Sequence, residues 1–175
     1  MIRKLVSSHD ELLTTVMEPF DFDAQLGMTA ESIAIDLTET CISNKGLGLA
    51  ANQIGLPYRA FVLMSNPVFA CFNPLIIHES DELIYLEEGC LSFPNFFIKI
   101  KRPREIRVRF TMPNGLKRTE KFSGITARCF QHELDHLNGV SYALRATVHH
   151  LDKAKREHKS LVRKNKMGTK VEVVL

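Results

Sequence analysis

Apolar residues recur at helical spacing in the segment 29–42, where Ile33, Leu37 and Cys41 stand four residues apart. This spacing places the three side chains on one stripe of an α-helix. Thr29 opens the segment and has the side chain of a good N-cap. We therefore predict a helix over 29–42.

Residues 59–122 instead carry short runs of β-forming residues between Pro, Asn, Gly and acidic residues. In the segment 106–110, apolar residues alternate with two arginines, the pattern of a strand with one buried and one solvated side. Pro-Asn-Gly at 113–115 then predicts a hairpin turn into the segment 117–122. The predicted strands are 60–64, 75–77, 83–86, 106–110 and 117–122.

Helical spacing returns in the segment 124–138 and again in 148–166. The order of elements is thus a helix, several short strands and two further helices. This order favours an α+β fold with a largely antiparallel sheet over alternating βα units. No internal repeat or linker divides the 175 residues, so we expect a single domain over 1–175.

The composition is that of a globular protein, with 45% hydrophobic and 25% charged residues. No apolar run approaches the roughly 18–20 residues that cross a bilayer, and residues 1–13 lack the pattern of a secretory signal. We therefore expect a cytoplasmic protein with no membrane partner. In that reducing compartment the cysteines are expected to be free thiols or metal ligands: Cys41, Cys71, Cys90 and Cys129.

The net charge of +3 is unevenly distributed along the chain. Residues 153–170 hold eight Lys or Arg and one acidic residue, which leaves the rest of the chain slightly acidic. Such a run is typical of a solvated helix face, but it also suits an anionic partner such as RNA or a membrane surface. The last residues, 171–175, either add an edge strand or fray.

The sequence His-Glu-Leu-Asp-His at 132–136 is the clearest sign of chemistry. Residues four apart on a helix share one face, so the side chains of His132 and His136 can reach one metal ion. Glu133 then lies beside the ion, where a carboxylate can handle the proton of a reacting water. The same residues also fit a surface helix with two solvated histidines, and a hydrolytic site needs a third ligand.

Three sources of that third ligand can be compared. A further histidine six residues after His136 is excluded, because Tyr142 stands there. Glu157 lies at the distance at which some zinc endopeptidases supply a glutamate, although its basic neighbours favour a solvated position. Cys90, in the segment 88–92, offers a thiolate in a glycine-containing bend, and a thiolate is a strong ligand.

The segment 46–53, Gly-Leu-Gly-Leu-Ala-Ala-Asn-Gln, follows the first predicted helix and is expected to form a loop. Its small residues allow the backbone to approach another chain or a ligand closely. Gln53 offers an amide donor for a developing oxyanion. Small residues after a helix also occur in ordinary tight turns.

Three segments, GLGLAANQ (46–53), EGCLS (88–92) and QHELDHLNG (131–139), resemble the signature motifs of peptide deformylases in content, order and spacing. The resemblance covers roughly residues 8–165. It implies an enzyme that hydrolyses the formyl group from the N-terminal formyl-methionine of new polypeptides and releases formate. It also implies mostly antiparallel β-sheets packed around a central helix that carries the His-Glu-x-x-His motif, with a C-terminal helix.

Carried onto this chain, the resemblance makes Cys90, His132 and His136 the metal ligands. It implies Fe²⁺ as the usual ion, with Zn²⁺, Ni²⁺ or Co²⁺ as substitutes. The ligand chemistry alone, one sulfur and two nitrogens, would favour Zn²⁺.

The resemblance also assigns the catalytic roles. Glu133 would take a proton from the attacking water and deliver it to the departing amine. The side chain of Gln53 and the backbone N–H of Leu91 would hold the oxyanion.

For the substrate, the resemblance implies pairing of an extended peptide with Gly48 and with the segment Glu87–Gly89. It implies an apolar methionine pocket lined by Leu47, Leu86, Ile125, Cys129 and His132. Two positions depart from the family, because Arg128 stands where many bacterial members have an apolar residue and Phe97 stands where they have an arginine. We expect these changes to alter the peptide preference beyond methionine.

The implied partners are the nascent formyl-methionyl polypeptide and, through the basic helix 148–166, the ribosome. We expect a monomer. Two other functions stay open at this point: a zinc endopeptidase that uses Glu157, and an inactive deformylase-like module that only binds the ribosome.

Overall fold

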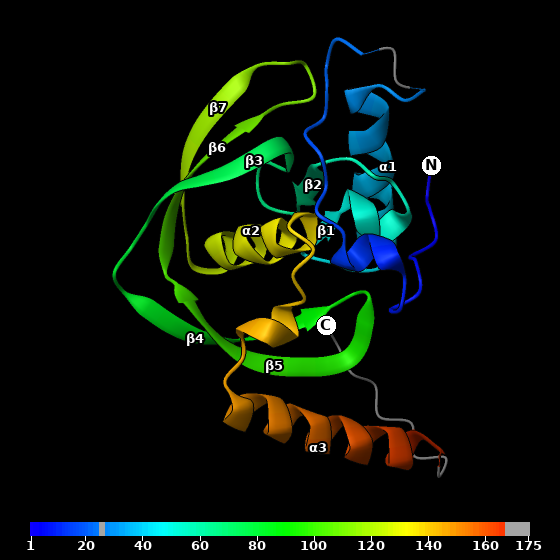
Figure 1. The fold of residues 1–175 in the computed structure, drawn as a ribbon, viewed down its shortest axis with the longest axis vertical. Helices are drawn as coiled ribbons and strands as arrows, with labels where there is room; N and C mark the ends of the chain where they lie inside the picture. Colours follow the sequence, from blue (N-terminus) through cyan, green and yellow to red (C-terminus); the bar gives the residue numbers. More distant parts are fainter. Residues whose placement is uncertain (25–26, 167–175) are drawn as a thin grey trace.

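The computed structural model describes residues 1–24 and 27–166 of the chain, and Figure 1 shows its elements. The helices are α1 (Ala30–Ser43), α2 (Gly124–Leu137) and α3 (Val148–Lys166). The strands are β1 (Gly48–Ala50), β2 (Ala60–Leu63), β3 (Phe69–Glu79), β4 (Leu83–Cys90), β5 (Phe93–Pro103), β6 (Glu105–Thr111) and β7 (Lys117–Ser123). Short 3-10 helices lie between them at η1 (Glu11–Thr14), η2 (Ala51–Ile54) and η3 (Tyr142–Arg145).

The strands form two separate antiparallel sheets. Five of them pair in the order β1-β2-β3-β6-β7, and β4 pairs with β5 alone. β1 and β4 are therefore both edge strands among the residues described. The predicted hairpin is confirmed, because Thr111 pairs with Lys117 across a turn in which Gly115 has a φ of 79°.

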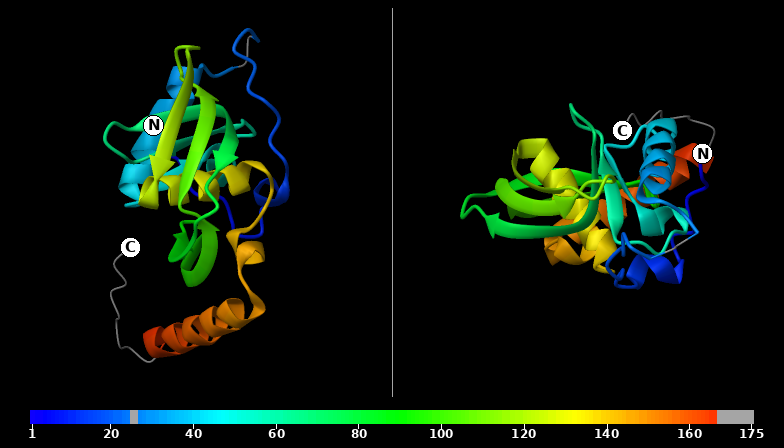
Figure 2. Two further views of the ribbon diagram at one scale, coloured as in Figure 1. Left: turned by 90° about the vertical axis from the view of Figure 1, so that its left-hand side faces the viewer. Right: turned by 90° about the horizontal axis from the view of Figure 1, so that it is seen from above.

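Helix α2 lies between the two sheets, as the views in Figures 1 and 2 agree. On one side it packs on the five-stranded sheet, where the rings of Phe130 and Phe61 meet edge to face with centroids 5.0 Å apart. On the other side it faces β4 and β5, and Gln131 Nε2 donates to the carbonyl of Pro103. The predicted α+β class, with antiparallel sheets around a central helix, is confirmed.

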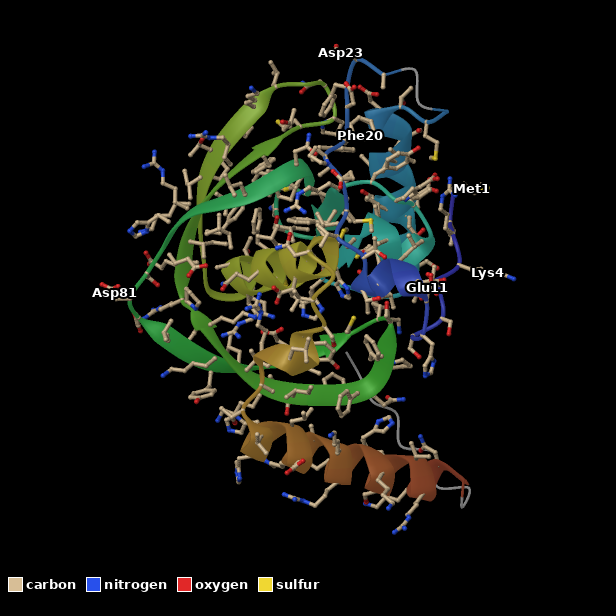
Figure 3. All side chains as sticks on the ribbon, in the orientation of Figure 1. Met1, Lys4, Glu11, Phe20, Asp23 and Asp81 are labelled. Carbon is tan, nitrogen blue, oxygen red and sulfur yellow. The ribbon has the colours of Figure 1, made fainter. Side chains whose placement is uncertain are left out.

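The three helices agree with the predictions to within a residue at either end. The Thr29 hydroxyl caps α1 by accepting from the Ser32 N–H at 3.2 Å, as expected of an N-cap. α3 packs against β5 with Ala154 buried, and most of its charged residues are exposed; Figure 3 shows the side chains that project from this helix. Within the described residues, none of the helices has both the length and the apolar character that a membrane crossing requires. The predicted strand or frayed end at 171–175 lies outside the described residues.

Parts of the strand prediction were wrong, and the predicted strand 75–77 is a piece of the longer β3. The segment 46–53 is not simply a loop, because it forms β1 and then η2: residues 48–50 pair with β2. Strand β5 was missed, although Ile98 and Ile100 alternate with Lys99 and Lys101 in the same way as the apolar residues of β6 alternate with arginines. β4 also runs on through Glu-Glu-Gly to Cys90, residues of low β-propensity that pairing with β5 holds extended.

Candidate metal centre

Cys90, His132 and His136 come together as a buried group whose ligand atoms lie within 4.8 Å of one another. The Sγ of Cys90 is 3.2 Å from Nε2 of His136. One thiolate sulfur and two imidazole nitrogens at this spacing fit a tetrahedral transition-metal ion. The other candidate ligand, Glu157, lies exposed on α3 and pairs with Lys153, so the structure does not bring it to the site.

The group forms because two elements meet. His132 and His136 are one turn apart on α2, and the centroids of their rings lie 5.1 Å apart. Cys90 ends β4, just after a shift of register between Glu88 and Cys90 against β5. Cys90 and His132 are 42 residues apart in the sequence, and the packing of the β4–β5 sheet on α2 brings them together.

Glu88 orients the first of these histidines. Its Oε2 lies 2.9 Å from Nδ1 of His132, while Arg102 donates to both carboxylate oxygens at 2.7 and 2.9 Å. Burial raises the pKa of Glu88, but the hydrogen bonds from His132 and Arg102 outweigh it and hold the pKa well below its usual range. The carboxylate therefore accepts from Nδ1–H and leaves Nε2 of His132 free for an ion.

From the sequence, Glu88 was expected only as part of the peptide-pairing segment Glu87–Gly89, and its contact with His132 was not predicted. The signal in the sequence was weak: Glu88 stands two residues before Cys90, but the shift of register between them means that strand alternation alone could not place it. The buried ion pair between Arg102 and Asp135, at 2.7 Å, had no such signal.

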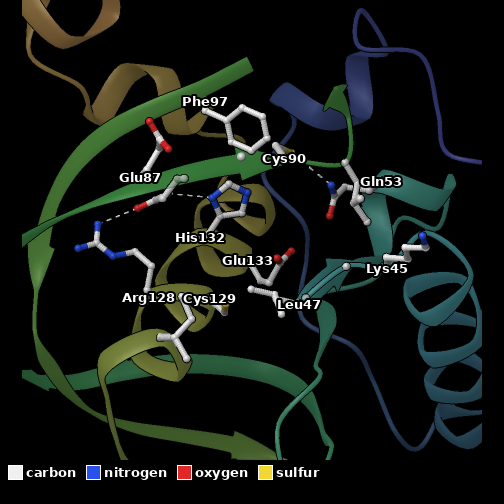
Figure 4. A pocket seen from close by; sticks show the side chains of 16 residues that line it. Lys45, Leu47, Gln53, Glu87, Cys90, Phe97, Arg128, Cys129, His132 and Glu133 are labelled. Atoms are coloured by element: carbon white, nitrogen blue, oxygen red, sulfur yellow. Dashed lines mark hydrogen bonds and ion pairs between the residues drawn. The ribbon is translucent and has the colours of Figure 1, made fainter. Parts of the chain in front are cut away.

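Glu133 lies in the wall of a cavity beside these ligands (Figure 4). Its Oε2 is buried without a hydrogen-bond partner in the described part of the chain. Burial raises the pKa of Glu133 to about 7, an effect that the charge of His132 opposes and that of Glu88 reinforces. A carboxyl group with such a pKa can both accept and donate a proton near neutral pH.

Gln53 reaches the same place from η2. Its Oε1 accepts from the Ala50 N–H at 2.9 Å, and its Nε2 donates to the Ser92 hydroxyl at 3.0 Å and points to Cys90 Sγ at 3.5 Å. The amide is thus fixed with its donor group beside a candidate ligand. Ser92 is a further polar residue of the site that sequence analysis did not single out.

The cavity has a volume of about 300 Å³. Most of the residues singled out from the sequence line it: Leu47, Gly48, Gln53, Glu87, Gly89, Cys90, Leu91, Ile125, Cys129, His132 and Glu133. Leu86 is half-buried and does not line the cavity, so its place in a methionine pocket stays a prediction.

The two departures from the family pattern also lie in the cavity wall. The Phe97 ring packs so closely on Gly89 that a Cβ there would stand 2.6 Å from a ring carbon. Arg128 is buried, and its Nη1 donates to Oε1 of Glu88 at 2.8 Å. Their effect on peptide preference stays a prediction.

Comparison with known proteins bears on this arrangement. The family profile described as polypeptide deformylase matches residues 2–156. The peptide deformylase of Afipia carboxidovorans is 36% identical over 164 residues, covering 89% of this chain and 90% of that protein. That of Bartonella quintana is 35% identical over 176 residues, covering 97% and 94%.

Solved structures are similar as well. The peptide deformylase of Thermotoga maritima has a TM-score of 0.77 at 36% identity, and the match covers 84% of this chain and 99% of that one. The enzyme of Ehrlichia chaffeensis has a TM-score of 0.78 at 31% identity, covering 95% and 99%.

Proposed function

This chain belongs to the polypeptide deformylase family, and we propose that it hydrolyses the formyl group from the N-terminal methionine of new polypeptides and releases formate. The strongest support is the convergence of Cys90, His132 and His136 at the wall of a cavity that Glu133 also lines, with its Oε2 buried and without a partner among the described residues. An endopeptidase that uses Glu157 has no support from the site, because that side chain is on the surface of α3.

We propose that Cys90, His132 and His136 hold an Fe²⁺ ion, for which Zn²⁺, Ni²⁺ or Co²⁺ can substitute. Three donors of this kind suit a catalytic site, in which a metal ion keeps one position open. When bound, such an ion supplies Lewis-acid chemistry, which polarises a carbonyl group and makes water more acidic. The Glu88 carboxylate holds the His132 ring in the orientation that this requires.

Glu133 moves the proton in this proposal. It takes one proton from the water that attacks the formyl carbon and passes it to the nitrogen as the C–N bond breaks, so that water and the formamide give formate and a free amine. The buried Oε2 of Glu133 supports this role, because no protein group in the described chain forms a hydrogen bond with it and it stays available for a proton.

The negative charge that develops on the formyl oxygen is held by Gln53 Nε2 and the backbone N–H of Leu91. Support comes from the fixed amide of Gln53, whose Oε1 is already occupied by the Ala50 N–H. Only the donor end of this amide is then directed to the side of Cys90.

The peptide is expected to lie between two strand edges. Gly48 belongs to β1 and Glu87–Gly89 to β4, each strand having one edge without a neighbour among the described strands, and both segments line the cavity. An extended peptide can add its backbone hydrogen bonds to such edges. The methionine side chain would enter the apolar part of the cavity at Leu47, Ile125 and Cys129.

Product analysis tests this function against the endopeptidase. The protein loaded with Fe²⁺ is incubated with a formyl-Met tripeptide, and the products are identified by mass spectrometry. We expect formate and the intact free tripeptide. Cleavage of a peptide bond with the formyl group retained would contradict the proposal.

We further propose that the protein works as a monomeric single domain in the cytoplasm and contacts the ribosome through α3. Exposed basic side chains support this contact, since anionic RNA attracts such a surface; they are Lys153, Lys155, Arg156, Lys159, Arg163 and Lys164. Removal of α3 would be a poor test, because Ala154 is buried against the body.

Charge reversal at Lys155 and Lys159 is the sharper test of ribosome contact. The doubly substituted Lys155→Glu, Lys159→Glu protein should no longer sediment with ribosomes at low salt, whereas the wild type should do so and be released by salt. Equal sedimentation of both would indicate an ordinary solvated helix face.

A further inference from the structure

The ligand group is split between two parts of the fold. Cys90 belongs to the two-stranded β4–β5 sheet, whereas His132 and His136 belong to α2, which packs on the five-stranded sheet. The distance between the sulfur and the two imidazoles therefore depends on how β4 and β5 are held against α2. Figure 4 shows the junction at which this contact is made.

Arg128 stands at that junction, one turn before His132 on the same face of α2. Its side chain is 97% buried (3% exposed), which is unusual for an arginine. Nη1 donates to Oε1 of Glu88 at 2.8 Å and to the carbonyl of Ile100 at 3.0 Å, while Nη2 donates to the carbonyl of Ile84 at 2.7 Å. One guanidinium group thus binds the main chain of both β4 and β5.

The second arginine of the junction works in a different way. Arg102 belongs to β5, holds Glu88 within its own sheet and reaches α2 only through Asp135. Of the two arginines, Arg128 is the one that binds from the helix to the backbone of the strands, and on the helix side Gln131 adds a hydrogen bond to the carbonyl of Pro103. The two arginines share Glu88 but do not replace each other.

The contacts of Arg128 lead to the metal centre through one intermediate. Glu88 accepts from Arg128 on Oε1 and faces Nδ1 of His132 with Oε2. The guanidinium group is planar and its donors have fixed directions. It therefore holds the carboxylate in one position and also stabilises its negative charge. Any shift of Glu88 is passed to the imidazole of His132.

We propose that Arg128 is a positioning residue for the metal centre. By binding Glu88, β4 and β5 to α2, it fixes the distance between Cys90 and the two histidines. It acts through these groups, and for Arg128 this role replaces the expectation from the family pattern that the residue alters the peptide preference. Within the described residues, every hydrogen bond of its guanidinium group goes to Glu88 or to a main-chain carbonyl, so its charge is already matched within the protein. We rest this inference on the proposed metal centre.

Cobalt binding tests the inference without relying on turnover. The dissociation constant for Co²⁺ is measured by chelator competition, together with the visible spectrum of the Co²⁺ protein, for Arg128→Leu, Arg128→Lys and the control Arg104→Leu. Arg104 also pairs with a glutamate, Glu82 at 2.9 Å, but on the surface and away from the cavity. Circular dichroism checks folding.

We expect Arg128→Leu to weaken Co²⁺ binding by about 10–100-fold and to alter the spectrum, because the group that orients His132 has lost a fixed partner. Arg128→Lys should bind Co²⁺ nearly as weakly as Arg128→Leu, since one ammonium group cannot donate to Glu88 and to both carbonyls in the geometry of the guanidinium group. Arg104→Leu should match the wild type.

If folded Arg128→Leu binds Co²⁺ with the affinity and the spectrum of the wild type, the inference is wrong. If that variant also has a raised KM for the formyl peptide, Arg128 acts on the substrate instead. If Arg128→Leu does not fold, Arg128→Lys decides between the same outcomes. Failure of the wild type to bind Co²⁺ at all would contradict the proposed metal centre itself, a result distinct from any difference between variants.

Discussion

Gly48 stands where any side chain would meet the carboxylate of Glu133. A Cβ at this position would lie 2.6 Å from Oε1 and 2.9 Å from Cγ of Glu133. Its φ is not in the left-handed region, so the glycine is required by close approach and not by backbone conformation. Besides its proposed place at a peptide-binding edge, this glycine thus leaves room for the carboxylate of Glu133.

We expect Gly48→Ala to lower kcat by about 10²-fold, because displacement of a proton-transferring group by an ångström has an effect of that size. Metal content should stay unchanged, since the three atoms nearest to the new methyl group all belong to Glu133, which is not a candidate ligand. Gly27→Ala is a matched control, because a Cβ at position 27 meets nothing within 4 Å. Steady-state kinetics and metal analysis check both variants; a wild-type kcat in Gly48→Ala would refute this account of the glycine.

Gln53 is the residue whose proposed role is easiest to confuse with a structural one. Its amide is buried and joins Ala50 to Ser92. We expect Gln53→Ala to reduce kcat/KM by the equivalent of about 2.7–4 kcal/mol, the usual effect of losing one oxyanion donor. Metal analysis decides the matter: full metal content supports the oxyanion role, and loss of metal would make Gln53 a structural residue.

At the scale of elements, local patterns predicted the helices well and the strands less well. The histidine pair followed from α2, because its two members are close in sequence. By contrast, β1 follows from pairing with β2, and β4 reaches Cys90 only because β5 holds it. Contacts between distant segments, such as that of Arg128 with Ile84, leave no local pattern and needed the structure.

Helix α2 depends on the five-stranded sheet for its position. Phe130 is fully buried and packs on Phe61 and Phe122. We expect Phe130→Ala to lower the free energy of unfolding by about 3–5 kcal/mol, the usual cost of a large cavity in a core. Leu144→Ala, at a side chain that is 77% exposed, should change it by less than about 0.5 kcal/mol. Urea unfolding compares the two, and equal effects would contradict this packing.

In the whole molecule, the two sheets and the C-terminal helix contribute to the proposed function in different ways. The five-stranded sheet supports α2, the β4–β5 sheet brings Cys90 to the histidines, and α3 presents positive charge away from the cavity. Motifs in the sequence predicted the candidate ligands and the family, whereas the contacts that hold Glu88 to Arg102 and Arg128 became visible only in the structure.

The most direct test of the central claim is the rate of formate release from a formyl-Met tripeptide, with protein prepared anaerobically with Fe²⁺ and with Glu133→Ala as its partner. We expect rapid release by the wild type and a rate about 10²–10⁴-fold lower in the variant at equal metal content. Folded, metal-loaded wild type that releases no formate, or releases it no faster than Glu133→Ala, would contradict the account.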